Sequence, residues 1–394
     1  MAERTRDIWN DDDGEKTPRK HPVLRGLLVF FLTLIVVLGI VLVAAYRDGT
    51  GFDTLRRYFS YGSTETVSGE TVFRYDASSG NRYAVLGNRL VVLSETKLSL
   101  LDPGGGEVWS TQVSMTAPAL QGNGSRAVAY DVGGTALYVV DQKGELLHLQ
   151  TEDEEPLIAA SLNRDGWLAV TEEKDNYKAW VTVYDEELEK VFAFKSSERF
   201  VTDARVTDDN DHLAVVTLGQ TDSVFTSNVV LYNLKKEDPV ADYGIEDGLV
   251  VAMGQQGDLL ATVSDTCLTL AGLDGTVTAE YRYGEDYLRG YALEGDDFAA
   301  LLLNRYQSGS AGRLVTIGAD GAELATLDVN QEVLGISAAG RYLAVLYADK
   351  LVIYNPELQA YASLTGTDFA SGVLMRPDGS ALLLSSEYAG LFLP

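Results

Sequence analysis

The sequence predicts an all-β domain, an eight-bladed β-propeller, preceded by one transmembrane helix. Two observations lead to this prediction. Residues 27–46 form an apolar run without a charge. From residue 70 onward, short runs of β-prone residues alternate with turns rich in Gly, Asp and Asn, and no stretch has a helical period. We therefore expect a membrane segment followed by one large repeat domain over residues 70–394.

The composition fits such a domain and restricts its partners. The chain has 394 residues, which is long for one ordinary domain but usual for an all-β propeller. Apolar residues make up 46% of it, as in globular proteins. The formal net charge of -27 argues against nucleic acid, whose phosphates require a basic surface, and favours a cationic or neutral partner. The single cysteine, Cys267, excludes an intramolecular disulfide and a cysteine-rich metal site.

The N-terminal apolar run, LLVFFLTLIVVLGIVLVAAY, is the predicted transmembrane helix. Its twenty residues match the roughly 20 that a helix needs to cross the hydrocarbon core. A cleaved signal peptide ending near residues 43–45 is the competing interpretation, but the apolar run is longer than signal peptides carry. Basic residues before the run outnumber those just after it, which predicts a single-pass cell-membrane protein with a cytoplasmic N-terminus and an extracytoplasmic propeller. The preceding basic residues are Arg4, Arg6, Lys16, Arg19, Lys20 and Arg25.

The segments on either side of this run complete the domain plan. Residues 1–26 hold six acidic and six basic residues and are predicted to be a disordered cytoplasmic tail. Residues 47–69 are predicted to form a short juxtamembrane helix, with Phe52, Leu55 and Tyr58 at helical spacing, and then a linker rich in Ser, Thr and Gly. The net negative charge of the chain therefore lies entirely beyond the membrane segment.

The repeat unit has four strands, named A to D, with tight polar turns between A and B and between C and D. Successive D strands are spaced by about 42 residues, within the ~40–45 of a four-stranded propeller blade. Eight A–B turns align with one another. They read LGNRLVVL, GNGSRAVAY, NRDGWLAV, DDNDHLAVV, QQGDLLATV, EGDDFAALL, AAGRYLAVL and RPDGSALLL.

Only seven D strands accompany these eight turns. The strand TVFRYD, which starts at Thr71, has no blade of its own. We expect it to pair with the C-terminal strand around GLFLP, because this pairing completes the eighth blade and leaves no exposed sheet edge at the end of the array. A seven-bladed ring is the alternative if one weak unit is misassigned.

These turns resemble those of known propellers. RPDGSALLL and NRDGWLAV are similar to the turn motif of WD40-like repeats in periplasmic propellers, and LSLLDPGGGEVWST, with Trp109, resembles the quinoprotein-type repeat. The layout of a charged tail, one span and a degenerate propeller resembles a family of uncharacterised, single-pass, membrane-anchored bacterial propeller proteins. The resemblance implies the fold and the location, but no activity, because its motifs are turn residues.

The residues that enzymes use are few and scattered. His21 lies in the tail, His148 on a D strand and His212 in an A–B turn, so they cannot meet in one site, and no G-x-S-x-G motif occurs. Membership of the quinoprotein dehydrogenases would imply a vicinal cysteine pair, which a single cysteine excludes. We therefore predict no enzyme, no catalytic residue, no cofactor and no metal site. The alternative is a hydrolase of sugars or peptides, with two carboxylates at ~5–9.5 Å in the propeller channel.

The topology predicts one binding face. In a meander, the B–C and D–A connections lie on the same face, and the long B–C connections are residues 171–178, 218–228 and 304–312. Long loops on a rigid scaffold are common binding sites. Their aromatic and cationic residues are the predicted partner-binding residues, although each of them also has the simpler interpretation of a solvated loop residue. They are Tyr177, Lys178, Phe225, Arg305 and Tyr306.

The D–A connections add acidic residues to this face. The acids lie in residues 151–155, 196–198, 245–248 and 284–286. They suggest a basic partner or a bridging cation, whereas ordinary solubilising turns are the simpler interpretation. The leading hypothesis is a membrane-anchored, extracytoplasmic scaffold, held in the membrane by residues 27–46, that binds a protein or a cell-envelope polymer. A sensor that signals to the cytoplasm is a further hypothesis.

Overall fold

The computed structural model describes residues 22–45, 57, 71–152, 155–221, 224–236, 239–245 and 248–394. They belong to two compact units, Met1–Phe59 and Ser60–Pro394. Residues 1–21 of the tail predicted over residues 1–26, and the predicted linker over residues 62–69, lie outside the described residues. So does the predicted juxtamembrane helix, except for Arg57, which is helical.

Helix α1 (Pro22–Ala45) accounts for all the described residues of the first unit except Arg57. It begins before the predicted boundary at residue 27, with a proline at its first position, where the missing backbone N–H leaves no bond unmade. The large apolar side chains described between residues 27 and 37 are all exposed. Among the residues that the structure describes, no helix is both long enough and apolar enough to cross a membrane. The predicted span is therefore not confirmed.

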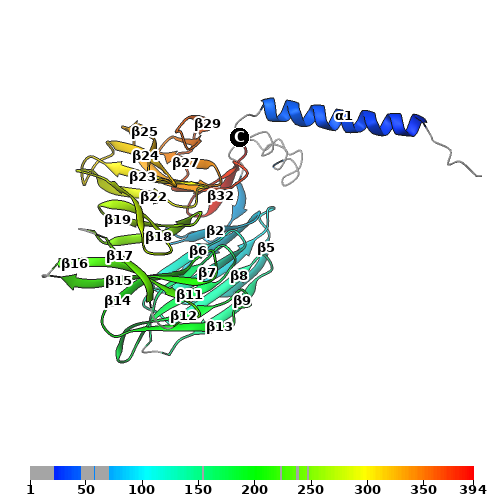
Figure 1. The fold of residues 1–394 in the computed structure, drawn as a ribbon. Helices are drawn as coiled ribbons and strands as arrows, with labels where there is room; N and C mark the ends of the chain where they lie inside the picture. Colours follow the sequence, from blue (N-terminus) through cyan, green and yellow to red (C-terminus); the bar gives the residue numbers. More distant parts are fainter. Residues whose placement is uncertain are drawn as a thin grey trace, which may run out of the picture. The chain divides into compact units, whose positions relative to one another are not determined.

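The second unit consists of eight four-stranded antiparallel sheets that follow one another along the chain (Figure 1). Blades 1 to 4 contain β2 (Arg82–Leu86), β3 (Arg89–Leu93), β4 (Lys97–Leu101) and β5 (Glu107–Gln112); β6 (Pro118–Gly122), β7 (Arg126–Asp131), β8 (Ala136–Asp141) and β9 (Glu145–Gln150); β10 (Leu157–Leu162), β11 (Leu168–Lys174), β12 (Tyr177–Tyr184) and β13 (Lys190–Ser196); β14 (Phe200–Val206), β15 (His212–Thr221), β16 (Val224–Asn233) and β17 (Pro239–Ile245).

Blades 5 to 8 complete the ring. They contain β18 (Val250–Gln256), β19 (Leu259–Ser264), β20 (Cys267–Gly272) and β21 (Val277–Arg282); β22 (Tyr287–Ala292), β23 (Phe298–Asn304), β24 (Gly312–Gly318) and β25 (Glu323–Val329); β26 (Val333–Ala339), β27 (Tyr342–Tyr347), β28 (Lys350–Tyr354) and β29 (Ala360–Thr365); β30 (Gly372–Met375), β31 (Ala381–Leu384), β32 (Tyr388–Phe392) and β1 (Thr71–Arg74).

The eighth blade closes the ring as predicted. Strand β1 pairs with β32 in an antiparallel register that places Phe73 opposite Ala389. The Phe73 side chain is 1% exposed and packs with Leu90 of blade 1 and Leu382 of blade 8. In Figure 1, the red strands of the last blade therefore meet the blue N-terminal strand. The eight-bladed prediction is confirmed, and the seven-bladed alternative is wrong.

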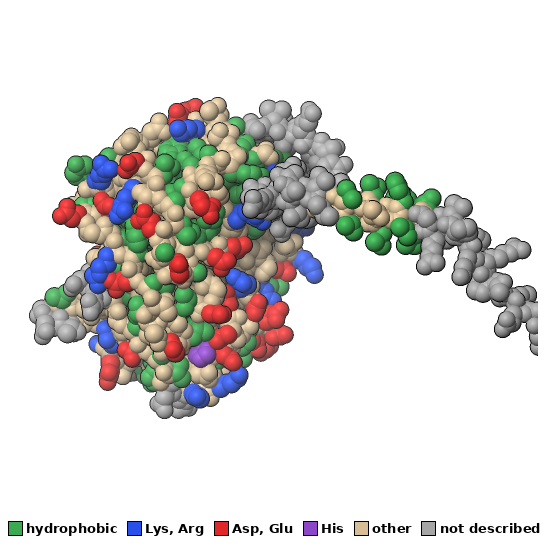
Figure 2. Space-filling view, turned by 45° about the horizontal axis from the view of Figure 1, so that its top comes forward, with side chains coloured by type: hydrophobic (Ala, Val, Ile, Leu, Met, Phe, Trp, Pro, Cys, Tyr) green, Lys and Arg blue, Asp and Glu red, His purple; other side chains and the backbone are tan. Residues whose placement is uncertain are grey.

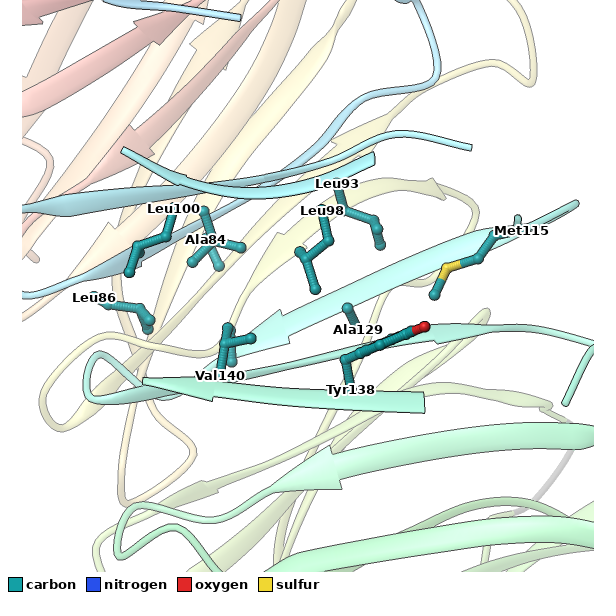
Figure 3. Packing of buried hydrophobic residues seen from close by; sticks show 11 residues of the cluster. Ala84, Leu86, Leu93, Leu98, Leu100, Met115, Ala129, Tyr138 and Val140 are labelled. Carbon is teal, nitrogen blue, oxygen red and sulfur yellow. The ribbon is translucent and has the colours of Figure 1, made fainter. Parts of the chain in front are cut away.

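Burial follows the position of each strand in its blade. Most residues of the two middle strands are buried on both sides, as in β23 and β27, whereas exposed and half-buried residues alternate along outer strands such as β9 and β21. Between blades 1 and 2, Leu93 and Leu98 face Tyr138 and Val140 (Figure 3). Each fully buried leucine stabilises such a packed pair of sheets by roughly 1.5–3 kcal/mol.

The A–B turns explain the motif that defines the repeat. In NRDGWLAV, Gly166 has a φ of 90°, a conformation that L-residues with a side chain rarely adopt, and the Asn163 side chain accepts the N–H of Trp167 at 2.8 Å. In RPDGSALLL, Gly379 has a φ of 83° and the Asp378 carboxylate accepts the N–H of Ser380 at 3.0 Å. The turn residues thus supply both the positive φ and a side-chain acceptor.

Successive A–B turns also bind one another. The face that carries them, together with the C–D turns, is called the turn face below. Hydrogen bonds connect the A–B turns of blades 1 to 5 in sequence, and those of blades 6 and 7. They are Gly87 N to Gly124 O at 2.9 Å, Asn123 Nδ2 to Asn163 O at 2.8 Å, Asn163 Nδ2 to Thr207 O at 3.1 Å, Asp208 N to Gln255 Oε1 at 2.8 Å, and Asp296 N to Gly340 O at 2.7 Å.

Candidate functional site

The opposite face, called the loop face below, is formed by the B–C turns and the D–A connections. In blade 3 these two parts are in contact, because Lys174 Nζ lies 2.8 Å from the Glu155 carboxylate. The structure thus places the B–C hairpin next to an acidic D–A connection, as the meander topology predicts. Acidic side chains are spread over the side of the molecule in Figure 2, with basic ones among them.

Two of the three predicted long loops are strands. Strands β11 and β12 continue to a tight turn, with Lys174 opposite Tyr177, and β15 and β16 pair along their full lengths, with Gln220 opposite Phe225. These polar residues were predicted as loops because they lack the alternation of apolar and polar residues that is typical of strands. They extend the strands beyond the packed part of the blade, where backbone hydrogen bonds pair them but no apolar side chain is buried. Only residues 305–311 of blade 6 form a loop between strands.

Tyr177 belongs to an aromatic and lysine cluster on the β11–β12 hairpin, whereas Lys178 Nζ lies 5.2 Å from the centroid of the Phe200 ring of blade 4. The Trp180 ring has Lys195 Nζ at 4.3 Å and Lys174 Nζ at 5.1 Å from its centroid, and Tyr177 meets it edge-on at 5.5 Å. Lys178 donates a hydrogen bond to the backbone O of Glu198 at 2.5 Å. Sequence analysis missed Trp180, because only the folded hairpin places lysines from two other segments over its ring.

The other three predicted residues lie on blades 4 and 6. Phe225 is 60% exposed and Tyr306 is 67% exposed. Arg305 forms an ion pair with Asp328 at 3.1 Å. The structure therefore places all five predicted residues on the loop face, but on three blades, and does not gather them into one pocket.

The hollow nearest to these residues lies between blades 6 and 7. It has a volume of about 470 Å³ and is lined by the inner strand of blade 6, its B–C loop and the connection to blade 7. Its polar and charged lining residues are Arg289, Asn304, Gln307, Ser308, Ser310, Gln331 and Glu332. Sequence analysis missed this pocket because its walls come from segments of two blades whose separation only the packing determines.

Two carboxyl groups of blades 3 and 4 are perturbed by their surroundings. Desolvation raises the pKa of Asp203, on the inner strand β14, to about 6, although the Ala204 N–H and Arg205 act in the opposite direction. Desolvation also raises the pKa of Glu172 on β11, against the lowering effect of Lys174. Among the described residues, no three His, Cys, Asp or Glu side chains converge as metal ligands.

The histidines and the cysteine have structural surroundings. His148 stacks on Tyr138 with ring centroids 4.2 Å apart, and His212 Nδ1 lies 2.7 Å from the Asp209 carboxylate. Cys267 is buried at the start of β20. These contacts place the two described histidines on separate blades.

The sequence as a whole matches one protein family. The profile described as "Family of unknown function (DUF5711)" matches residues 57–358, well over half of the chain. The chain belongs to this family. No curated protein matches this DUF5711 member in sequence. The predicted resemblance to a propeller family of unknown function is thus confirmed. The family match does not show the membrane anchoring that the resemblance implied.

Solved structures share the fold of this DUF5711 protein. The C-terminal WD40 domain of Sif2 has a TM-score of 0.58 and 14% identity, over 83% of this chain and 99% of that one. BamB from Moraxella catarrhalis has a TM-score of 0.53 and 13% identity, over 82% of this chain and 100% of that one. At these identities the likeness shows the fold alone.

Proposed function

We propose that this protein is a binding scaffold that captures a protein partner on the loop face of its propeller. The observation that carries the proposal is an arc of apolar side chains along four consecutive blades. Blades 4 to 7 each present one large apolar residue, between 38% and 54% exposed, at the loop-face start of the inner strand. These residues are Phe200, Val251, Tyr287 and Leu334.

The arc has the composition of an interface centre. Aromatic residues such as Phe200 and Tyr287 are enriched in protein interfaces. Phe225 and Tyr306 lie beyond the arc, on the β15–β16 hairpin and on the loop of blade 6. A partner that covers the arc would also contact these two side chains. Substituting them therefore tests whether the partner binds the loop face.

The charge of the chain indicates the kind of partner. The net charge of -27 attracts a basic surface and repels an acidic one. We therefore propose a protein with apolar side chains surrounded by Lys or Arg, rather than nucleic acid. A cell-envelope polymer is the second candidate, favoured by the predicted location.

The location is the second part of the proposal. The twenty uncharged residues 27–46 and the basic residues that precede them support a single-pass anchor in the cell membrane. In this arrangement the N-terminus is cytoplasmic and the propeller is extracytoplasmic. Protease treatment of intact cells tests this arrangement, because an extracytoplasmic propeller is degraded and a cytoplasmic one is protected.

A variant comparison tests the capture of a partner. The full-length chain is cross-linked in its native membranes, and the captured proteins are quantified for the natural chain and for the Phe225→Ser, Tyr306→Ser double variant. The matched control is Val191→Ser, Val277→Ser, which removes two exposed apolar residues from outer strands. We expect the Phe225→Ser, Tyr306→Ser variant to capture at least about tenfold less partner than the natural chain, equivalent to about 1.4 kcal/mol of binding free energy. The control is expected to capture as much as the natural chain. Equal capture by all three chains would overturn the proposal.

A further inference from the structure

The pocket between blades 6 and 7 has a fixed shape. Its B–C loop is held by a hydrogen bond from Asn304 Nδ2 to the backbone O of Gly309 at 2.9 Å, and by one from the Arg305 N–H to the backbone O of Ala311 at 3.0 Å. Gly309 has a φ of 113°, which a residue with a side chain rarely adopts. A ligand therefore meets a preformed loop and does not need to order it on binding.

Two arginine side chains outside the pocket are paired with opposite charges, whereas the charged side chains that line it are not. Outside it, Arg313 pairs with Asp286 at 2.7 Å, and Arg305 pairs with Asp328 at 3.1 Å. Inside it, the side chains of Arg289 and Glu332 form no hydrogen bond or ion pair with each other or with any other described residue. The pocket therefore offers one free cation and one free anion, contributed by the inner strand of blade 6 and by the connection to blade 7.

Most of the remaining lining residues are polar, although Leu302, Val329 and Val333 also line the pocket. Side-chain amides of Gln307 and Gln331 and hydroxyl groups of Ser308 and Ser310 donate and accept hydrogen bonds. The volume of about 470 Å³ lies within the ~300–1,000 Å³ usual for small-molecule sites, whose walls are mostly apolar. A polar wall of this size suits a small ligand with several hydrogen-bonding groups.

We propose that this pocket binds a small zwitterion, namely an amino acid or a short peptide whose two ends carry opposite charges. Arg289 binds the carboxylate with its planar donors, and Glu332 binds the ammonium group. The amides and hydroxyl groups contact the peptide bond. This inference goes beyond the proposed scaffold function and does not depend on it, because neither Arg289 nor Glu332 belongs to the arc of apolar residues.

The test is calorimetric titration of the full-length protein in detergent micelles with the dipeptide Ala-Ala. N-acetyl-Ala-Ala lacks the ammonium group, and Ala-Ala amide lacks the carboxylate. The variants are Arg289→Gln and Glu332→Gln, and the matched control is Arg305→Gln, whose guanidinium lies outside the pocket lining. A charged partner contributes enough to binding that each pocket variant is expected to weaken Ala-Ala binding at least about fivefold, while the control leaves it unchanged.

The two modified probes make the assignment specific. Arg289→Gln is expected to leave the binding of Ala-Ala amide unchanged, since that probe has no carboxylate to lose. Glu332→Gln is likewise expected to leave N-acetyl-Ala-Ala unaffected. Three results would each overturn the proposal. They are no heat of binding with Ala-Ala, equal affinity of the natural protein for all three probes, and an affinity of the pocket variants for Ala-Ala equal to that of the natural protein. Partner capture is measured separately with Phe225 and Tyr306, so failure of one proposal is distinguishable from failure of the other.

Discussion

The turn face and the loop face of the propeller use their polar residues differently. On the turn face, Asn163 is fully buried and connects its own turn to that of blade 4. On the loop face, the tips of blades 3, 4 and 6 extend beyond the packed sheets and leave Phe225 and Tyr306 exposed. The turn face therefore links neighbouring blades by hydrogen bonds, whereas the loop face leaves large aromatic side chains open to a partner.

The largest expected effect concerns the closure on which both faces depend. Phe73→Ala removes a buried ring between the first and last blades and is expected to lower the free energy of unfolding by roughly 3–5 kcal/mol. Thermal unfolding of the purified protein measures this. Deleting Thr71–Arg74 is expected to lower the melting temperature further. Arg74→Ala, on the exposed side of the same strand, is the control, and an equal effect of both substitutions would contradict the closure by Phe73.

A smaller effect is expected within the turn face. Asn163→Ala leaves the Thr207 carbonyl and the Trp167 N–H without their side-chain partner, so a loss of about 2–3 kcal/mol is expected. The matched control is Asn228→Ala on the loop-face part of β16, whose amide makes only a long contact with Asp242 at 3.5 Å. Urea unfolding distinguishes the two variants. Equal losses would remove the difference between the faces.

The inner strand that runs between the faces provides a pH test. The pKa of Asp203 is about 6 in the folded protein, against 3.8 for a free carboxyl. Because the folded state binds the proton more tightly, this residue favours folding at low pH, and stability is lost as the pH rises from about 4 to about 6. Asp203→Asn is therefore expected to stabilise the protein by on the order of 2 kcal/mol at pH 7, and by little at pH 4. Equal gains at both pH values would contradict the raised pKa.

The smallest effect on stability is expected at the loop face. Arg305→Ala breaks an ion pair whose two side chains are both exposed, so the free energy of unfolding should change by less than about 0.5 kcal/mol. Chemical unfolding at low and moderate salt measures it. A loss as large as that of Asn163→Ala would mean that this face also supports the ring.

Much of the fold was predictable because local chemistry specifies it. Each A–B turn carries its own Gly, Asp or Asn signal, and the unpaired strand at Thr71 predicted the closing pair with β32. The loop face was predicted in position but not in form. The hairpins of blades 3 and 4 lack an apolar alternation at their tips, since nothing packs there. The pocket with Arg289 and Glu332 depends on the spacing of two blades, which no local pattern encodes.

Site-specific photo-cross-linking in intact cells tests the difference between the faces most directly. A photoreactive amino acid replaces either Phe225 on the loop face or Asp258 in an A–B turn of the turn face. A discrete cross-linked product is expected from position 225 and not from position 258. A product from position 258 alone, or the same product from both positions, would contradict the assignment of binding to the loop face.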